Sequence, residues 1–175
     1  MKYVRCDSHC KYPAYTQEET DIMINETKQY AKEYTDNISQ PEVMTLKLDA
    51  THTLLNDEKY EKLNIVEADK VGSSLSVEDG QIIIGAGINN IVIEYDSNLI
   101  PETTGLKFAS LFKNGDGEPL IISNNYGTSS QRTHIAHIRR LLSVEEGDYF
   151  ELKVFGKTGD VFEKNRTYIT IEKIN

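Results

Sequence analysis

The chain has 175 residues, a formal net charge of −9 and an isoelectric point near 5.0. Its apolar content of 38% allows one ordinary domain with a modest core and an appendage. An acidic surface repels phosphate groups and anionic lipids, and no apolar run approaches the roughly 20 residues of a membrane-spanning helix. We therefore expect no nucleic-acid partner and no membrane insertion.

Residues 1–15 form a short segment that contains tyrosines, both cysteines and several basic side chains. The segment lacks the apolar stretch of roughly 7–15 residues that marks a secretory signal, so we expect a protein made in a reducing cytoplasm. Cys6, His9 and Cys10 are a weak candidate metal site, because thiolates and imidazoles suit zinc. One chain supplies too few of these ligands to close a tetrahedral site. The alternative is an anchor turn without metal, and we expect no cofactor.

A helix is predicted over residues 16–38. Thr16 and Glu19 have the spacing of a capping box, and Pro41 follows the end of the helical pattern. Apolar and small side chains recur along one face at alternating spacings of four and three positions: Met23, Thr27, Tyr30 and Tyr34. A stripe this narrow favours a short self-associating coil with these four residues at its seam. The alternative is a helix packed on the rest of the chain or on another protein.

From Val43 onward, apolar and polar residues alternate with a period of two, which is typical of strands. Short strands are separated by turn signals such as Asp79-Gly80 and Asn114-Gly115. We therefore predict a mainly β sandwich over residues 41–175. In the strand at residues 106–112 we expect the larger apolar side chains to face inward, and we expect a polar loop at residues 123–132. The inward set in that strand is Leu106, Phe108 and Phe112.

Two strands near the C-terminus each carry one tyrosine on an otherwise polar face. Phe150, Leu152 and Val154 share the face opposite Tyr149, and Ile169 and Ile171 share the face opposite Tyr168. Tyrosine suits contacts between protein copies because it joins apolar area to a hydroxyl group. The alternative interpretation is that both are ordinary surface tyrosines, which are common.

No arrangement of catalytic residues is present in the sequence, and we expect no enzyme and no catalytic residue. The chain has no nucleophile-elbow motif, and its Gly85-Ala-Gly87 run lacks the third glycine of a dinucleotide-binding loop. His134 and His137 lie three positions apart on a predicted strand. We expect them on opposite faces and unable to share a metal ion.

Five stretches of the predicted sandwich, in this order, resemble the jelly roll of tumour-necrosis-factor-like ligands and complement globular heads. These stretches are Tyr60-Glu-Lys-Leu63, Asp79-Gly80 before Ile82-Ile-Ile84, Lys107-Phe-Ala-Ser-Leu-Phe-Lys-Asn-Gly115, Glu146-Gly-Asp-Tyr-Phe-Glu-Leu152 and Thr167-Tyr-Ile-Thr-Ile-Glu172. The resemblance implies a jelly-roll head at residues 41–175 that forms a tight homotrimer. It also implies that Tyr149 and Tyr168 lie at the interface between heads.

Near the N-terminus, the stretch Tyr12-Pro-Ala-Tyr-Thr-Gln-Glu-Glu-Thr-Asp21 resembles a segment that recurs in bacteriophage fibre and appendage proteins. Gln17 and Thr20 differ from the residues usual at those positions of the segment. This resemblance implies a trimeric fibre on the surface of a virion. Residues 16–40 would be its stalk, and residues 1–15 would anchor it to a capsid or tail protein. The anchoring residues would be Tyr3, Tyr12 and Tyr15.

Two other functions fit the same residues. A carbohydrate-binding knob would recognise a host surface glycan through amide, hydroxyl and aromatic groups of the predicted polar loop, namely Asn124, Asn125 and Tyr126. A bacterial surface or spore-coat protein would use the same head on a different carrier. An enzyme built on a jelly roll would need clustered inward histidines, and the four histidines here are scattered.

Overall fold

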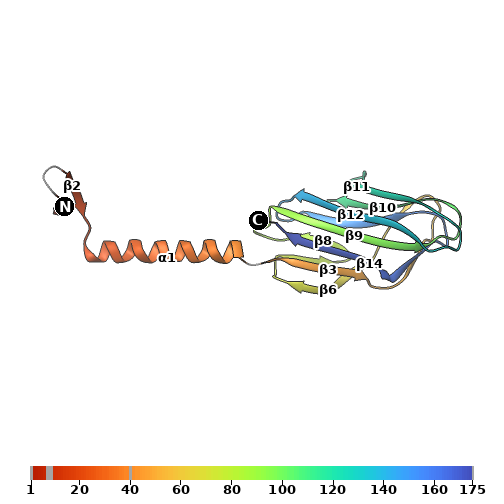
Figure 1. Ribbon diagram of the computed structural model, residues 1–175, viewed down its shortest axis with the longest axis horizontal. Coiled ribbons are helices and arrows are strands. Elements are labelled where there is room, and N and C mark those ends of the chain that lie inside the picture. The colour runs from red at the N-terminus through yellow and green to blue at the C-terminus, as the bar shows by residue number, and fades with distance from the viewer. Residues whose placement is uncertain (1, 7–9, 40, 175) are drawn as a thin grey trace. The chain divides into compact units, whose positions relative to one another are not determined.

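The computed structural model describes residues 2–6, 10–39 and 41–174, and the side chains of residues 15–34 and 41–174 (Figure 1). The chain divides into two compact units, Met1–Gln40 and Pro41–Asn175. The first unit contains a hairpin and a helix, and the second contains the sandwich, which we call the head.

The first unit begins with an antiparallel hairpin of β1 (Lys2–Cys6) and β2 (Cys10–Ala14), and continues into α1 (Gln17–Ser39). The predicted helix and its capping box are confirmed. The Thr16 N–H donates to Glu19 Oε2 at 2.7 Å, and the Glu19 N–H donates to Thr16 Oγ1 at 3.1 Å. The bond from the Thr16 backbone is the main cause of the lowered pKa of Glu19. These reciprocal bonds satisfy amide groups that a helix start otherwise leaves unpaired.

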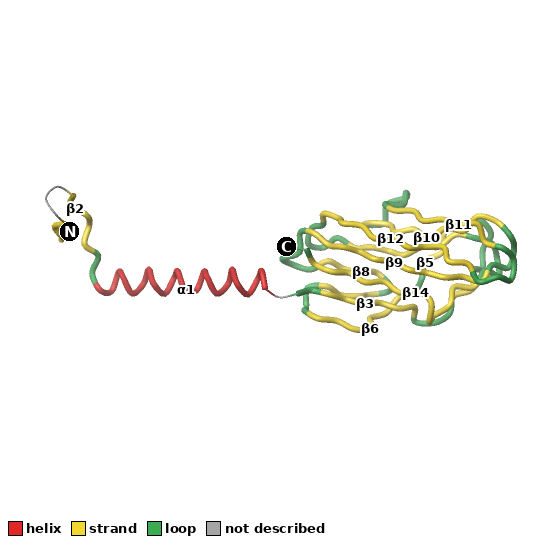
Figure 2. Tube along the Cα trace, viewed as in Figure 1, coloured by secondary structure: helices red, strands yellow, loops and turns green. Residues whose placement is uncertain are grey.

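The head consists of two antiparallel six-stranded sheets, which we name after a central strand of each. The β9 sheet has the order β12-β9-β14-β3-β6, with β4 beside β14. Its strands are β3 (Val43–Leu48), β4 (His52–Thr53), β6 (Ile65–Val71), β9 (Asn90–Ile100), β12 (Thr133–Ser143) and β14 (Val161–Lys173). Figure 2 shows its long strands side by side along the head, with loops gathered at both ends.

The β13 sheet has the order β11-β10-β13-β8-β7, with β5 beside β13. Its strands are β5 (Tyr60–Lys62), β7 (Leu75–Glu78), β8 (Gln81–Ile84), β10 (Gly105–Lys113), β11 (Ile121–Gly127) and β13 (Tyr149–Phe155). Asp79 and Gly80 link β7 to β8 with φ angles of 49° and 69°, as a tight hairpin turn requires. Asp-Gly supplies these conformations at low cost, which explains why the turn was predictable.

The core lies between the two sheets and takes alternate side chains from each strand. Met44, Leu46 and Leu48 of β3 are fully buried, and so are the inward residues of β13, which are Phe150, Leu152 and Val154. Ile169 and Ile171 of β14 are buried as well. The mainly β sandwich and the alternation predicted for β13 and β14 are therefore confirmed.

The prediction for β10 is wrong in its choice of face. Ala109 and Leu111 enter the core, while Leu106 is exposed and Phe108 and Phe112 point to the outward side of the β13 sheet. The strand contains apolar residues on both faces, so its hydrophobic pattern does not separate inside from outside. Its inward face also holds a lysine, which a pattern based on apolar residues assigns to solvent.

The outward aromatic residues of β10 form a row with residues of β13 and β5. Phe108 meets Phe155 with ring centroids 5.2 Å apart, Phe155 meets Tyr60 at 5.5 Å, and Tyr60 meets Phe112 at 5.1 Å. The Lys153 ammonium lies 4.3 Å from the centre of the Phe112 ring. Cover from Tyr60 and Lys153 explains why Phe112 is buried although it faces away from the core.

A fully buried ion pair joins β10 to the loop that precedes β14. Lys107 Nζ donates to Asp160 Oδ2 at 2.7 Å, and both side chains are 0% exposed. The same carboxylate accepts the N–H groups of Lys157 at 2.7 Å and Glu102 at 2.8 Å. The stretch from Glu102 to Lys107 and the loop at residues 157–160 therefore meet at Asp160. Removal of either charge leaves the other buried without its partner, which is costly.

We predict that Lys107→Ala lowers the free energy of unfolding by about 3–5 kcal/mol, because Asp160 loses its buried counter-charge. The matched control is Lys59→Ala, since Lys59 is an exposed lysine of the head, and it should change the free energy by less than about 0.5 kcal/mol. Urea denaturation followed by circular dichroism measures both. Equal stability of the two variants would contradict the role given to the pair.

Candidate functional site

The apolar stripe of α1 is exposed in a single chain. The described helix side chains at positions 17–34 are all exposed except Thr20, which is half-buried. Tyr30 is 71% exposed, and its ring stacks on Tyr34 with centroids 6.4 Å apart. No helix among the described residues has the length and apolar content needed to cross a bilayer. A helix of this length gains most of its stability by covering such a stripe against another helix or domain.

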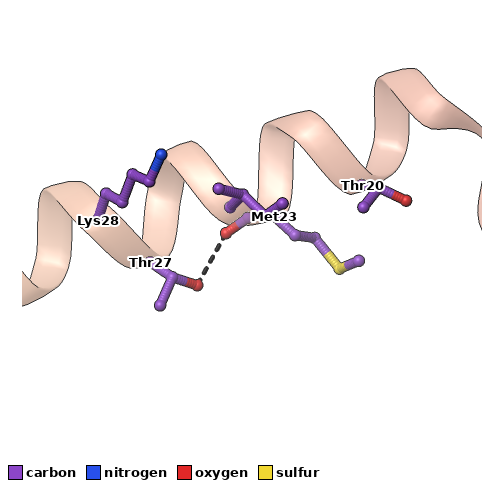
Figure 3. Close-up of a pocket in the computed structure, with 5 residues that line it drawn as sticks. Thr20, Met23, Thr27 and Lys28 are labelled. Carbon is purple, nitrogen blue, oxygen red and sulfur yellow. Dashed lines mark hydrogen bonds between the residues drawn. The ribbon is translucent and has the colours of Figure 1, made fainter.

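A shallow groove runs along this stripe and is lined by Thr20, Met23, Ile24, Thr27 and Lys28 (Figure 3). The Thr27 hydroxyl donates to the Met23 carbonyl oxygen at 2.8 Å, and the Thr20 hydroxyl donates to the Thr16 carbonyl oxygen at 3.0 Å. Because the hydroxyl groups are satisfied within the helix, these threonines present their methyl groups as contact surface. The predicted seam is therefore more apolar than its residue types suggest.

Three rows of side chains cross the outward face of the β9 sheet, each row with one residue from β12, β9, β14, β3 and β6. The apolar row is Leu141, Val92, Glu172, Val43 and Val71. The middle row is Arg139, Glu94, Thr170, Thr45 and Asp69. The tyrosine row is His137, Asp96, Tyr168, Lys47 and Val66. Strands distant in sequence thus build one continuous surface.

Of the three rows, the apolar row is the one whose exposure to water is least favourable in free energy. Leu141 at one end is 64% exposed and Val71 at the other end is 52% exposed. Four of the five residues in the row are aliphatic, although they face away from the core. Val92 and Val43 are half-buried and Glu172 lies between them, so the exposed apolar area is concentrated at the two ends of the row. Exposed apolar area that gathers in this way is typical of contact surfaces.

Tyr168 lies at the centre of the tyrosine row. Its side chain is 51% exposed, and its hydroxyl donates to the Asn165 carbonyl oxygen at 2.6 Å. This bond holds the ring in place over the face of the sheet, so that the ring lies ready for contact at little cost in side-chain entropy. The structure therefore places one of the two predicted interface tyrosines on the candidate surface.

Tyr149 lies on a different surface. It belongs to β13 and points to the outward side of the β13 sheet, where it is half-buried and its hydroxyl lies against the turn at Gly115. Tyr149 and Tyr168 therefore do not form one contact surface within a head. The sequence shows which face of a strand a residue occupies but not which sheet the strand joins.

The prediction that His134 and His137 point to opposite faces is wrong. A register shift between His134 and Ala136 inserts a bulge, which brings both rings to the same carboxylate. His134 Nε2 lies 3.2 Å from Asp96 Oδ1, and His137 Nδ1 lies 3.5 Å from Asp96 Oδ2. Within the described part of the chain, no group of three histidine, cysteine or acidic side chains is placed to hold a metal ion.

The predicted metal ligands of the first unit lie at the β1–β2 hairpin. Cys6 and Cys10 are partners in the strand register, but their side chains and all of His9 lie outside the described residues. The weak candidate metal site at Cys6, His9 and Cys10 stays a prediction.

The predicted anchor residues occupy the same unit. Tyr3 pairs with Pro13 and Tyr12 pairs with Val4 in the hairpin register, but their side chains lie outside the described residues. Tyr15, which precedes α1, is exposed. The hairpin gives the anchoring segment a defined backbone, and its anchoring role stays a prediction.

The predicted receptor residues lie within β11 and not in a loop, because β11 continues to Gly127. The Asn125 amide donates to the His134 carbonyl oxygen at 2.7 Å and accepts the Tyr126 N–H at 2.7 Å, so it holds β11 against β12. Asn124 and Tyr126 have exposed side chains. Of the three residues, these two are available to a ligand.

No family model matches the chain, and no curated protein sequence matches it. Solved structures do match it. A crystal structure of murine APRIL at pH 5.0 covers 77% of this chain and 100% of its own, with a TM-score of 0.63 and 12% sequence identity. The structure of Eiger TNF from S. frugiperda covers 78% of this chain and 94% of its own, with a TM-score of 0.60 and 8% identity.

These likenesses show the fold of the head, which is a TNF-like jelly roll. The resemblance that the sequence suggested for residues 41–175 is therefore confirmed at the level of fold. At 12% and 8% identity, the comparison carries neither partners nor assembly over to this chain.

We predict that Leu141→Asp weakens self-association of the chain by at least about tenfold in concentration, because it places a charge in the apolar row. Leu106→Asp is the matched control, since Leu106 is an exposed leucine on the outward face of the other sheet. Sedimentation at several protein concentrations measures both variants. A similar effect of the two substitutions would show that the apolar row has no special part in association.

Proposed function

We propose that this protein is a homotrimeric structural protein of a virion, with α1 as a stalk and the head as a projecting knob. The observation that carries the proposal is that the chain has two exposed apolar surfaces, the stripe of α1 and the apolar row of the β9 sheet. Both surfaces become more stable when another apolar surface packs against them and removes them from water. Other copies of the same chain supply such a surface without a second gene product.

Neither surface by itself gives the trimer its full stability. Apolar burial contributes about 25 cal/mol per Å², while association costs on the order of 4–15 kcal/mol in lost freedom. A coil of two to three heptads is marginal alone, as short helices are in water. When the stalk and the head associate together, the loss of translational and rotational freedom is incurred only once. Contact between the stalks raises the effective concentration of the heads, and the reverse holds as well.

A trimer with cyclic symmetry suits attachment to a particle. Rotation about one axis places all three copies of residues 1–15 at the same end of the assembly. Three weak anchors then bind one particle surface with the strength of avidity. Three copies are favoured over other numbers by the sequence resemblance of residues 41–175 to tumour-necrosis-factor-like ligands, which implies a homotrimer.

The resemblance of residues 12–21 to bacteriophage fibre segments supports a virion over a bacterial surface or spore-coat carrier. In this assembly the anchor binds a capsid or tail protein, and the protein resides on the virion surface. Contact with a host surface glycan would use the exposed side chains of β11, Asn124 and Tyr126. Such contact is secondary to the structural role, since Asn125 is already used within the head.

Measurement of molar mass in solution tests the trimer. We expect the full chain to sediment at three times 19.9 kDa at micromolar concentration. We expect a shortened chain that begins at Pro41 to form the same trimer with at least about tenfold weaker association, since the stripe of α1 is lost. The head has its own core, so the shortened chain remains folded. A full chain that sediments as a single copy would overturn the proposal.

Binding to particles tests the virion assignment. Antibodies against the head should label intact phage particles of the source culture, and added full-length protein should bind particles that lack it. A chain without residues 1–15 should remain trimeric but fail to bind, because the anchor is lost and the stalk is kept. Labelling of bacterial cells or spores in place of particles would assign the protein to the bacterial surface.

A further inference from the structure

We propose that the heads of the trimer meet head to tail through opposite charge, with the β12 edge of one copy against the β6 edge of the next. This inference rests on the proposed homotrimer and names its contact surfaces. In a closed ring of three identical copies, each copy must offer two different surfaces that fit each other. The two edges of the β9 sheet have opposite charge, so the edge of one copy can attract the other edge of the next copy.

The β12 edge is basic in a chain whose net charge is −9. The strand Thr133–Ser143 contains two arginines and two histidines and no acidic residue. Arg139 reaches Glu94 only at 3.7 Å and is largely exposed. Arg140 is exposed and has no ion pair among the described residues. Asp96 faces both histidines and Glu94 faces Arg139, so within the described residues Arg140 is the one arginine or histidine of this strand with no carboxylate beside it.

The β6 edge at the other end of the same sheet is acidic. Glu67 and Asp69 are exposed, and the one lysine of the strand, Lys70, reaches Glu67 at 3.8 Å. The turn between β7 and β8 adds the exposed Glu78 and Asp79 on the neighbouring edge of the other sheet. More acidic than basic groups therefore lie along this side of the sandwich.

The same two edges hold the exposed ends of the apolar row. Leu141 follows Arg140 along β12 on the opposite face of the strand, since Leu141 pairs with Val92 and Arg140 with the buried Ile93. Val71 and Asp69 share the outward face of β6. Contact between these edges buries aliphatic area while the charges set orientation and register. A twofold dimer through β12 would instead place the arginines of two copies against each other, which like charges oppose.

Charge reversal tests the arrangement in the full chain. Arg140→Glu and Asp69→Arg should each raise the concentration at which the trimer dissociates, by about tenfold at low salt, because the change acts at all three interfaces. The double variant with both substitutions should return toward the unmodified protein, since the charges are exchanged between the edges. The matched control is Lys59→Glu, which changes the net charge as Arg140→Glu does but lies on a loop before β5.

Sedimentation at low and high salt separates the outcomes. Weakening by each single reversal, recovery in the double variant and a smaller difference at high salt support the head-to-tail arrangement. A trimer that neither reversal weakens overturns this arrangement and leaves the trimer intact. Weakening without recovery overturns the facing of Arg140 and Asp69. An unmodified chain that is a single copy overturns the trimer itself, so the two failures are distinguishable.

Discussion

Alternation of side chains along the strands of the head is the constraint on which the rest of the structure depends. Each strand places every second residue in one shared core, where the inward residues of β3, β13 and β14 are fully buried. The remaining residues must lie outside, whatever their chemistry. An apolar residue in an outward position is therefore not explained by the fold. The apolar row from Leu141 to Val71 consists mainly of such residues, which is why we propose it as a contact surface.

The buried pair of Lys107 and Asp160 shows that the core also admits charge when its geometry is complete. One carboxylate accepts hydrogen bonds from an ammonium group and two backbone N–H groups, and two of these three donors, Lys107 and Glu102, lie 53 and 58 positions away in the chain. The pair draws β10 inward through Lys107 and leaves the aromatic residues Phe108 and Phe112 on the outward side. The inward face of β10 therefore holds Lys107 together with Ala109 and Leu111 and leaves the larger aromatic rings outside.

Both units of the chain expose apolar side chains next to hydroxyl groups that are already hydrogen-bonded. The stripe of α1 has threonine hydroxyl groups satisfied within the helix, and the face of the β9 sheet has a tyrosine hydroxyl satisfied by a carbonyl of its own strand. In both places polar atoms are already paired, so contact with another copy costs little desolvation. In the trimer that we propose, the apolar parts supply contact area, and the opposite charges of the β12 and β6 edges supply direction.

The sequence by itself determined the features that depend on near neighbours. These are the capping box at Thr16, the turn at Asp79 and Gly80, the faces of β13 and β14, and the mainly β class of the head. Only the tertiary structure decided that Tyr149 and Tyr168 belong to different sheets, that a bulge turns His134 and His137 toward one carboxylate, and that five strands build one apolar row. Those features depend on pairing between strands that are distant in the chain, and local residue patterns do not encode the partner of a strand.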